Sequence, residues 1–330
     1  MKGITVKKYG SSDVLEYTDL PDPVPEIDQV LIEVHGASVN YADIKARKGE
    51  YHLGSPLPFV PGLDAAGVVL DVGNEVTHIR PGDHVIAFTA AGSYAEKAIA
   101  SQSLTYIVPK TINLRKAAAA VLVAGTATHM LRYLARIKAN ESLLIHTAAG
   151  GVGSTALQIA KNLGVQRIYG STGSSWKEVH VKKLGAIGVV DYNSETYARD
   201  IIKLTDKNGV DVILNPLGGA TIERDLHCLA PFGRLIVFGE LNNQASNLLP
   251  NALYTSNKTI IGSSFGHFRK VRPGLVRETI DKVIQLLADE QIEMIIDKCF
   301  PLHQASQAHQ QLEDREVLGK VVLVPAALLA

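Results

Sequence analysis

The sequence is poor in cysteine and has no excess of either charge. Cys228 and Cys299 are the only cysteines in 330 residues, which excludes a disulfide framework and a thiolate-rich zinc or iron–sulfur site. We therefore expect a reducing, cytoplasmic environment. Lys plus Arg and Asp plus Glu total 33 each, so no global field recruits nucleic acid or an anionic membrane. We expect neither as a partner.

Long apolar runs and metal-ligand patterns are also missing. The longest apolar stretches, residues 117–125 and 321–330, are about half as long as a bilayer span. The first residues, MKGITVKKYG, contain no apolar core of a signal peptide. The eleven histidines include no H-x-x-x-H pair. The sequence therefore predicts no secretion, no membrane anchor and no catalytic metal.

The chain is long enough for two packed cores, and its pattern changes near residue 117. Before that point, short β-branched runs alternate with Pro and Gly, which is typical of a compact, mostly β region. After it, strand-like runs alternate with helical ones, which predicts right-handed βαβ units and a parallel sheet. The strand-like runs of the two regions are residues 29–34, 66–71 and 84–88, then 142–146, 167–170, 188–191, 211–214 and 234–238.

The last part of the chain predicts a strand, an amphipathic helix and a final apolar strand, at residues 259–263, 273–290 and 320–324. We expect these pieces to return to the first domain. The chain then has a discontinuous domain of residues 1–120 and 263–330, interrupted by an inserted domain of residues 121–262.

A glycine-rich turn follows the first strand of the inserted domain. Ala148-Ala149-Gly150-Gly151-Val152-Gly153 has the A-x-G-x-x-G form of the dinucleotide fingerprint. Gly150 would let the backbone approach a pyrophosphate, Gly153 would allow close helix–strand packing, and the helix N-terminus presents free N–H groups. A tight connection without a ligand is the alternative, but the strand before and the helix after favour dinucleotide binding.

The second strand of the inserted domain ends without a carboxylate, in Gly170-Ser171-Thr172-Gly173-Ser174-Ser175-Trp176-Lys177. An acidic residue there would bind the adenosine ribose hydroxyls, whereas hydroxyls and Lys177 can accept a 2′-phosphate. The sequence therefore favours NADPH. Lys177 could instead merely be solvated on the following helix, and Tyr192, a second candidate after the third strand, could merely pack.

The segment around Asn40 has a complete local explanation. Asn40 is placed to cap a short helix, Asp43 lies three residues on in a capping-box position, and Gly49 stops the helix. Asp43 and Arg47 are i,i+4 neighbours, for which an ordinary surface ion pair is the simplest interpretation.

Taken together, these segments resemble the zinc-independent quinone oxidoreductase (zeta-crystallin) branch of the medium-chain dehydrogenase/reductase superfamily. The similarity runs nearly end to end, and GSSDVLEYTDLPDP, ASVNYADIKARKGEY, PFVPGLDAAGVV, AAGGVG, DVILNPLGG and GRLIVFGE are among the matching segments. The resemblance implies an α/β protein in which a Rossmann doubly wound parallel sheet is inserted into a mostly β GroES-like catalytic domain. It also implies an NADPH cofactor and a homodimer.

The resemblance places candidate residues along the cofactor. Asn40 and Thr126 lie near the nicotinamide, Gly151 and Val152 at the pyrophosphate, and Ser171, Lys177 and Tyr192 at the 2′-phosphate. The remaining cofactor-binding candidates are Ala149, Gly150, Gly153, Gly173, Leu217, Phe238, Gly239, Phe265 and Lys320.

Two departures from relatives matter for the chemistry. Zinc-dependent members would need a Cys near Ala37, a His–Glu pair near Leu63 and Asp64, and a four-cysteine lobe, all of which are missing. Related reductases often carry a Tyr, proposed as a proton donor, at the position of Lys45. The candidate catalytic residues are therefore Asn40, Tyr41, Asp43 and Lys45.

Hydride transfer without a metal suits acceptors that need little electrophilic help, such as quinones and other α,β-unsaturated carbonyl compounds. Asn40 or a nearby group would hydrogen-bond the acceptor carbonyl, and Tyr41, Lys45 or water would supply the proton. One alternative is a 2-enoyl-thioester reductase, whose CoA or carrier substrate could use Lys45, Arg47 and Lys48. An alternative of another class is a noncatalytic NADPH-binding sensor or structural protein.

Overall fold

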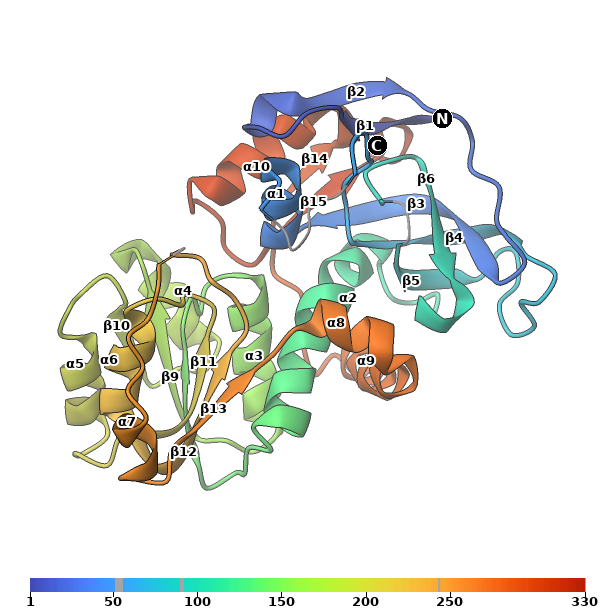
Figure 1. Ribbon diagram of the computed structural model, residues 1–330. Helices are drawn as coiled ribbons and strands as arrows, with labels where there is room; N and C mark the ends of the chain where they lie inside the picture. The colour runs from blue at the N-terminus through green and yellow to red at the C-terminus, as the bar shows by residue number, and fades with distance from the viewer. Residues whose placement is uncertain (51–55, 90–91, 243, 330) are drawn as a thin grey trace. The chain divides into compact units, whose positions relative to one another are not determined.

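The computed structural model describes residues 1–50, 56–89, 92–242 and 244–329. The chain divides into two compact units (Figure 1). Unit 1 comprises Met1–Gly125 and Arg269–Ala330, and unit 2 comprises Thr126–Phe268. The chain passes from one unit to the other inside helix α2 (Leu114–Thr128) and inside helix α8 (Phe265–Val271).

Unit 2 is built on a six-stranded sheet in the order β10-β9-β8-β11-β12-β13, with every neighbouring pair parallel. The strands are β8 (Ser142–Ile145), β9 (Arg167–Thr172), β10 (Gly188–Asp191), β11 (Val210–Asn215), β12 (Leu229–Val237) and β13 (Thr259–Gly262). This order confirms the predicted doubly wound parallel sheet. The connections reverse direction between β8 and β11, the two central strands.

The helices of unit 2 alternate with its strands along the chain (Figure 1). They are α3 (Gly151–Asn162), α4 (Glu178–Lys183), α5 (Tyr197–Leu204), α6 (Thr221–Cys228) and α7 (Asn251–Tyr254). On one face of the sheet, Leu144 and Ile213 from the strands pack in one cluster with Tyr197 and Ile201 of α5 and Leu226 of α6. Central strands covered on both faces consist of apolar runs, which explains why this region was predictable.

Strand β13 does not return to the first domain, which corrects our expectation for residues 259–263, although the predicted boundary at residue 262 includes Thr259–Gly262 in the inserted domain. It pairs with β12 in parallel, with Thr259 opposite Arg234 and Gly262 opposite Val237, and so forms the sixth strand of the unit 2 sheet. A short β-branched run predicts a strand but does not specify its partner.

Unit 1 contains a seven-stranded, largely antiparallel sheet and a separate antiparallel pair, β1 (Lys2–Val6) with β2 (Leu15–Asp19). The larger sheet runs β14-β15-β3-β4-β5-β7, with β6 also paired to β3. Its strands are β3 (Gln29–Val39), β4 (Asp64–Val72), β5 (His84–Phe88), β6 (Lys97–Ser101), β7 (Thr105–Ile107), β14 (Ile296–Pro301) and β15 (Lys320–Val324). The predicted mostly β domain is confirmed.

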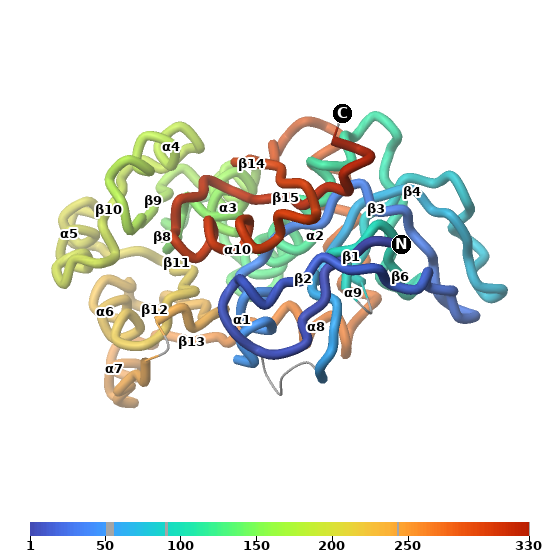
Figure 2. Tube along the Cα trace, turned by 90° about the horizontal axis from the view of Figure 1, so that it is seen from above, coloured from blue at the N-terminus to red at the C-terminus, as the bar shows by residue number. Residues whose placement is uncertain are grey.

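The end of the chain joins its beginning in unit 1. Strand β15 pairs antiparallel with β3, with Val321 opposite Val39, and Figure 2 shows these late segments, in red, beside the early strands, in blue. Helices α1 (Tyr41–Lys48), α9 (Pro273–Ala288) and α10 (Ala305–Glu313) complete the unit. This pairing places Lys320 and Asn40 close together although they are far apart in sequence.

One helical stretch is apolar enough to merit attention. Helix α2 and the π-helical turn His129–Leu134 together span Leu114–Leu134, which could cross a membrane by length and composition. However, 78% of its most apolar window is buried inside the protein. The central alanines are completely covered, as in a core helix.

Candidate active site

The glycine-rich turn lies where β8 meets α3. The helix begins at Gly151, and Gly150, in an extended conformation, precedes it without a side-chain cap. The backbone N–H groups of Gly151, Val152 and Gly153 belong to the first turn, where no carbonyl of the same helix can accept them. These donors and the positive end of the helix dipole form a site suited to a phosphate or pyrophosphate.

The two key glycines of this turn serve different purposes. A Cβ on Gly153 would lie 2.4 Å from the Thr147 carbonyl oxygen and 2.6 Å from the Ala148 Cα, so close helix–strand packing requires glycine there. A Cβ on Gly150 would meet only the Thr147 oxygen, at an ordinary 3.4 Å. The protein itself therefore leaves room at Gly150, and a dinucleotide pyrophosphate fits the turn at this point.

The loop after β9 is closed against the end of β10. A Cβ on Gly173 would lie 2.3 Å from the Tyr192 hydroxyl oxygen, so Tyr192 packs directly on the Gly173 backbone. Asn193 also donates its side-chain N–H to the Gly173 carbonyl at 3.2 Å. No carboxylate stands between Thr172 and Lys177. The structure thus brings Gly173 and Tyr192 together beside the segment that carries Lys177.

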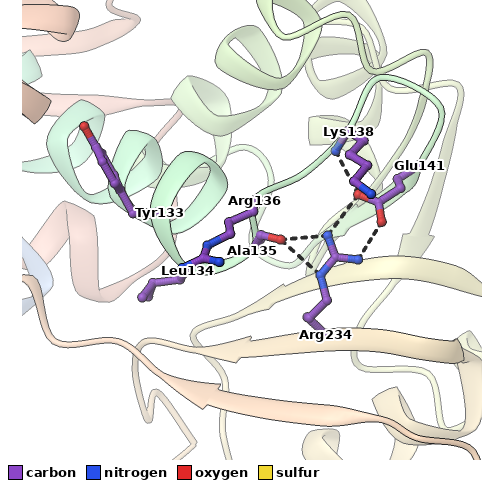
Figure 3. A pocket seen from close by; sticks show the side chains of 7 residues that line it. All are labelled: Tyr133, Leu134, Ala135, Arg136, Lys138, Glu141 and Arg234. Carbon is purple, nitrogen blue, oxygen red and sulfur yellow. Dashed lines mark hydrogen bonds and ion pairs between the residues drawn. The ribbon is translucent and has the colours of Figure 1, made fainter.

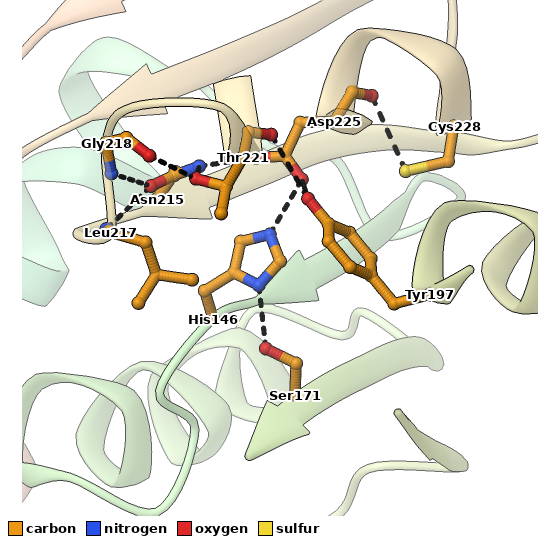
Figure 4. Close-up of polar contacts among 9 residues, drawn as sticks. All are labelled: His146, Ser171, Tyr197, Asn215, Leu217, Gly218, Thr221, Asp225 and Cys228. Atoms are coloured by element: carbon orange, nitrogen blue, oxygen red, sulfur yellow. Dashed lines mark hydrogen bonds and ion pairs between the residues drawn. The ribbon is translucent and has the colours of Figure 1, made fainter. Parts of the chain in front are cut away.

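Ser171 does not fit its predicted contact with a 2′-phosphate. Its side chain is fully buried, and its hydroxyl lies 2.7 Å from His146 Nδ1 (Figure 4). On the other side of the imidazole, Nε2 lies 2.7 Å from Asp225 Oδ1, which also accepts the Tyr197 hydroxyl at 2.8 Å. The Ser171 hydroxyl is thus part of a buried network that joins β9 to β8 and α6.

The same network fixes the turn after β11. Asn215 donates its Nδ2–H to Asp225 Oδ2 at 2.6 Å, and its Oδ1 accepts the backbone N–H groups of Leu217 at 2.7 Å and Gly218 at 2.9 Å. Figure 4 shows these contacts converging from several elements. His146 directly follows β8 and Asn215 ends β11, the two strands at which the connections reverse, so the network lies beneath the edge where doubly wound sheets bind nucleotides.

Phe238 and Gly239 follow β12 and lie against that turn. The Phe238 N–H donates to the Asn215 carbonyl at 3.0 Å. A Cβ on Gly239 would lie 2.9 Å from the Pro216 carbonyl oxygen, so glycine permits this close approach. Leu217 is 1% exposed, which leaves its backbone rather than its side chain for a ligand.

Thr126 and Phe265 belong to unit 2 and flank an aromatic group. His129, one helical turn after Thr126, stacks on Phe268 with ring centroids 4.1 Å apart and lies 5.9 Å from Phe265. It begins a π-helical turn, a feature frequent at functional sites. Its Nδ1 has no hydrogen-bond partner among the described residues, and burial lowers its pKa. Sequence reasoning did not single out His129.

A cavity of about 490 Å³ in unit 2 is lined by none of the predicted cofactor-binding residues, although Tyr133 in its wall stacks on His129 (Figure 3). Its walls include the end of the π-helical turn, Glu141 just before β8, and Arg234 on β12. The Arg234 guanidinium donates to Glu141 at 2.7 Å and to the Ala135 carbonyl oxygen at 2.7 Å. Because Glu141 precedes the amino end of β8, the cavity is at the opposite edge from the glycine-rich turn.

In unit 1, the Asn40 side chain is held on both sides. Its carbonyl oxygen accepts a hydrogen bond from the Lys320 ammonium at 2.5 Å. Its Nδ2 donates to Asp64 Oδ1 at 3.0 Å and to the Ser38 carbonyl oxygen at 3.2 Å. Asn40 and Lys320 are 5% and 4% exposed. The pair is therefore a fixed, charge-assisted unit rather than a freely rotating amide.

Asp43 is buried, which conflicts with its predicted role as a proton donor. Its Oδ2 accepts the Asn40 backbone N–H at 2.9 Å, as expected for a capping box, and the Tyr94 hydroxyl at 3.4 Å. Burial, reinforced by the nearby Asp64 carboxylate, raises the pKa of Asp43 to about 7. Burial also raises the pKa of Asp64 and lowers that of Lys320.

Arg47 does not form the predicted surface ion pair with Asp43. Its side chain is completely buried, donates to the Gly10 carbonyl oxygen at 3.1 Å, and pairs with Glu313 at 2.8 Å. Glu313 also pairs with Lys48 at 2.6 Å. The i,i+4 spacing was correct, but both side chains face the interior, where α10 supplies the partner. Arg47 is therefore not available at the surface for an acyl carrier.

Tyr41 and Lys45 lie elsewhere on α1. Tyr41 is 38% exposed, and Lys45 is partly exposed. They are the two candidate proton donors that the structure leaves accessible. Tyr51, the last residue of the segment ASVNYADIKARKGEY, lies outside the described residues.

Comparisons with known proteins agree with both units. Residues 26–110 match the family described as "Alcohol dehydrogenase GroES-like domain", and residues 151–289 match "Zinc-binding dehydrogenase". The chain is 33% identical to the quinone oxidoreductase of Sus scrofa, covering 98% of each chain. It is 29% identical to the "Synaptic vesicle membrane protein VAT-1 homolog" of Rattus norvegicus, covering 98% of this chain and 84% of that protein. The structure of Escherichia coli quinone oxidoreductase complexed with NADPH matches with a TM-score of 0.92 and 30% identity, over 98% of this chain and 100% of that chain.

A Rossmann unit inserted into a GroES-like unit defines an oxidoreductase of the medium-chain dehydrogenase/reductase type. Within that superfamily, the chain belongs to the quinone oxidoreductase branch and is a quinone oxidoreductase-like enzyme. The resemblance drawn from the sequence is confirmed.

The word "zinc" in one family description does not fit the residues of this chain. The sequence has no Cys near Ala37 and no His–Glu pair near Leu63 and Asp64, which zinc-dependent relatives would need. Among the residues that the structure describes, no three His, Cys, Asp or Glu side chains gather where they could hold a metal ion.

Proposed function

We propose that this enzyme reduces a quinone or another α,β-unsaturated carbonyl compound with NADPH and without a metal ion. The observation that carries the proposal is the carboxyl edge of the unit 2 sheet. There, a turn whose first N–H groups have no acceptor in their own helix adjoins a β9 loop that contains no carboxylate before Lys177. When bound, NADPH supplies the hydride. The chain binds, orients and protects it.

The cofactor-binding residues divide by their place on that edge. We assign the pyrophosphate to the N–H groups of Gly151 and Val152, with Gly150 giving access. We assign the 2′-phosphate to Lys177 and Tyr192. The Ser171 hydroxyl is not included, because it is hydrogen-bonded to His146. Near the nicotinamide we propose Thr126, Phe238, Gly239 and Phe265 of unit 2. For unit 1, the resemblance implies roles for Asn40 and Lys320.

We propose that the Asn40–Lys320 pair activates the carbonyl group of the hydride acceptor. The lysine ammonium at the amide oxygen polarises the amide and strengthens its N–H groups as donors. Ser38 offers Nδ2 two acceptors, its carbonyl oxygen and its hydroxyl oxygen, each at 3.2 Å and so farther than Asp64 Oδ1 at 3.0 Å, and an acceptor carbonyl would replace Ser38. As negative charge develops on that carbonyl, the donor would stabilise it.

The proton then comes from Tyr41, Lys45 or water. Asp43 is not included, because its carboxyl is enclosed by Asn40 and Tyr94. We further propose a homodimer and a cytoplasmic location, both implied by the resemblance.

The two alternative functions receive less support. A 2-enoyl-thioester reductase would use cations near Lys45, but Arg47 and Lys48 are both committed to Glu313. A noncatalytic NADPH-binding protein would need no polarised amide, whereas Asn40 is held by a buried lysine.

A turnover panel tests the function. NADPH oxidation is followed with 1,4-benzoquinone, 9,10-phenanthrenequinone, an alkenal and crotonyl-CoA, with NADH in parallel. Quinone or alkenal turnover that prefers NADPH would support the proposal. Turnover of crotonyl-CoA alone would favour the thioester reductase. NADPH binding without any turnover would favour the noncatalytic alternative.

The assignment of Lys177 has its own test. Lys177→Ala should weaken NADPH binding by roughly ten-fold, because one charge-assisted contact is lost, while NADH binding stays nearly constant. Lys183→Ala removes an exposed charge from α4, the helix that follows Lys177, and should change neither affinity. Equal losses for both cofactors in Lys177→Ala would refute the 2′-phosphate assignment.

A further inference from the structure

The only tryptophan of the chain is exposed beside the proposed 2′-phosphate site. Trp176 occupies the middle of a single 3-10 turn, Ser175–Lys177, directly after the β9 loop. Its side chain is 55% exposed. An exposed indole ring offers a large, flat apolar face to solvent or to a ligand.

The loop that carries Trp176 is held firmly. The Thr172 hydroxyl donates to the Ser174 carbonyl oxygen at 3.1 Å, and the Lys177 backbone N–H donates to the same oxygen at 3.1 Å. Tyr192 closes the loop from the side at Gly173. The indole is therefore exposed in a loop whose conformation is fixed by these contacts.

Lys177 lies over the tryptophan ring. Its Nζ is 5.1 Å from the ring centroid, within the range of a cation–π contact. The Lys177 ammonium, which would bind the 2′-phosphate, and the indole ring of Trp176 therefore lie side by side. An adenosine 2′-phosphate offers the matching chemistry, an anion and a flat base on the same ribose.

We propose that Trp176 stacks on the adenine ring of the bound dinucleotide. The inference rests on the proposed NADPH site and extends it to the base. In a doubly wound sheet the adenosine ribose binds at the end of the second strand, which is β9 here. Aromatic side chains stack on nucleobases through their π-faces, and such a stack changes affinity by roughly ten-fold.

The solitary tryptophan allows a direct test without turnover. Adenosine 2′,5′-bisphosphate, which carries the base and the 2′-phosphate but no nicotinamide, is titrated into the full chain while tryptophan fluorescence is recorded. The fluorescence should change to saturation, because the only indole lies at the site. Nicotinamide mononucleotide, which lacks adenine, should leave it unchanged.

Variants measured by calorimetry separate stacking from charge. Trp176→Ala should bind adenosine 2′,5′-bisphosphate about ten-fold more weakly, and Trp176→Phe should recover most of the affinity. Val179→Ala, at an exposed apolar position three residues on, should bind as the wild type does. Lys177→Ala should weaken binding but keep the fluorescence change.

The outcomes distinguish failure of the stacking proposal from failure of the proposed NADPH site. If the bisphosphate binds with equal affinity to wild type and Trp176→Ala, and fluorescence is constant, the stacking proposal is overturned while the NADPH site stands. If neither the bisphosphate nor NADPH binds the wild-type protein, the proposed function fails and the stacking proposal fails with it.

Discussion

Replacing Asp43 by asparagine should make the stability difference from the wild type depend on pH. In the folded protein, burial and the neighbouring Asp64 raise the pKa of Asp43 to about 7, against an ordinary value of 3.8. Between these values the folded state holds a proton that the unfolded chain has lost, so rising pH removes stability. The stability that the protonated Asp43 carboxyl contributes is fully present below about pH 4 and is lost by about pH 7. An asparagine side chain does not titrate in this range, so the variant escapes the loss.

The size of the effect follows from the pKa. Each pH unit of that window corresponds to about 1.4 kcal/mol, which gives a change of about 4 kcal/mol between acid and neutral pH. The amide is isosteric with the carboxyl and can still accept the Asn40 backbone N–H through its oxygen. The free energy of unfolding of Asp43→Asn minus that of the wild type should therefore rise as pH rises.

Urea unfolding at several pH values measures this difference. Circular dichroism is the appropriate signal, because the only tryptophan belongs to unit 2 and would not report on α1. Asp289→Asn, which removes an exposed carboxylate, serves as the control. A difference for Asp43→Asn that stays constant from acid to neutral pH would refute the reasoning that the buried carboxyl keeps its proton.

Further variants examine unit 2. Gly153→Ala places a Cβ 2.4 Å from the Thr147 carbonyl oxygen, so urea unfolding should show a loss of about 1–3 kcal/mol. Gly150→Ala meets that oxygen only at 3.4 Å, so its stability should stay near wild type while calorimetry shows weaker NADPH binding; unchanged binding would contradict the pyrophosphate assignment. His146→Ala removes the partner of Ser171 and a donor to buried Asp225, which should cost about 3 kcal/mol and lower the melting temperature of unit 2 by about 6–12 °C. A melting temperature equal to wild type would show that the network is dispensable.

Much of the fold could be predicted because its signals are local. The buried runs of β8 and β11, the glycine-rich turn between strand and helix, and the helix cap at Asn40 are each contained in a few consecutive residues. Alternating strands and helices then restrict the sheet to parallel, right-handed connections. The pairing of segments that are distant in the sequence has no such local signal, which is why the pattern alone did not show that β13 pairs with β12.

The error at Arg47 has the same physical origin. An i,i+4 spacing shows that two side chains can meet on a helix, but not whether that face points to water. Its direction depends on α10, which brings His309 within 3.3 Å of the guanidinium and Glu313 within 2.8 Å. A charged residue on a short helix therefore cannot be assigned to the surface until its packing partner is known.

The network of Asn40 shows what a sequence motif leaves open. The resemblance proposes Asn40 near the reaction, but its donor capacity depends on partners contributed by β3, β4 and β15. Because Lys320 occupies the amide oxygen, the orientation of the amide is fixed, and only an N–H can face an acceptor. An acceptor carbonyl must then compete with Ser38 for that N–H, so the proposed catalytic hydrogen bond is an exchange of partners and not the filling of an empty position. Such an exchange favours an acceptor that carries developing negative charge over a neutral one, which is the preference that hydride transfer to a quinone requires.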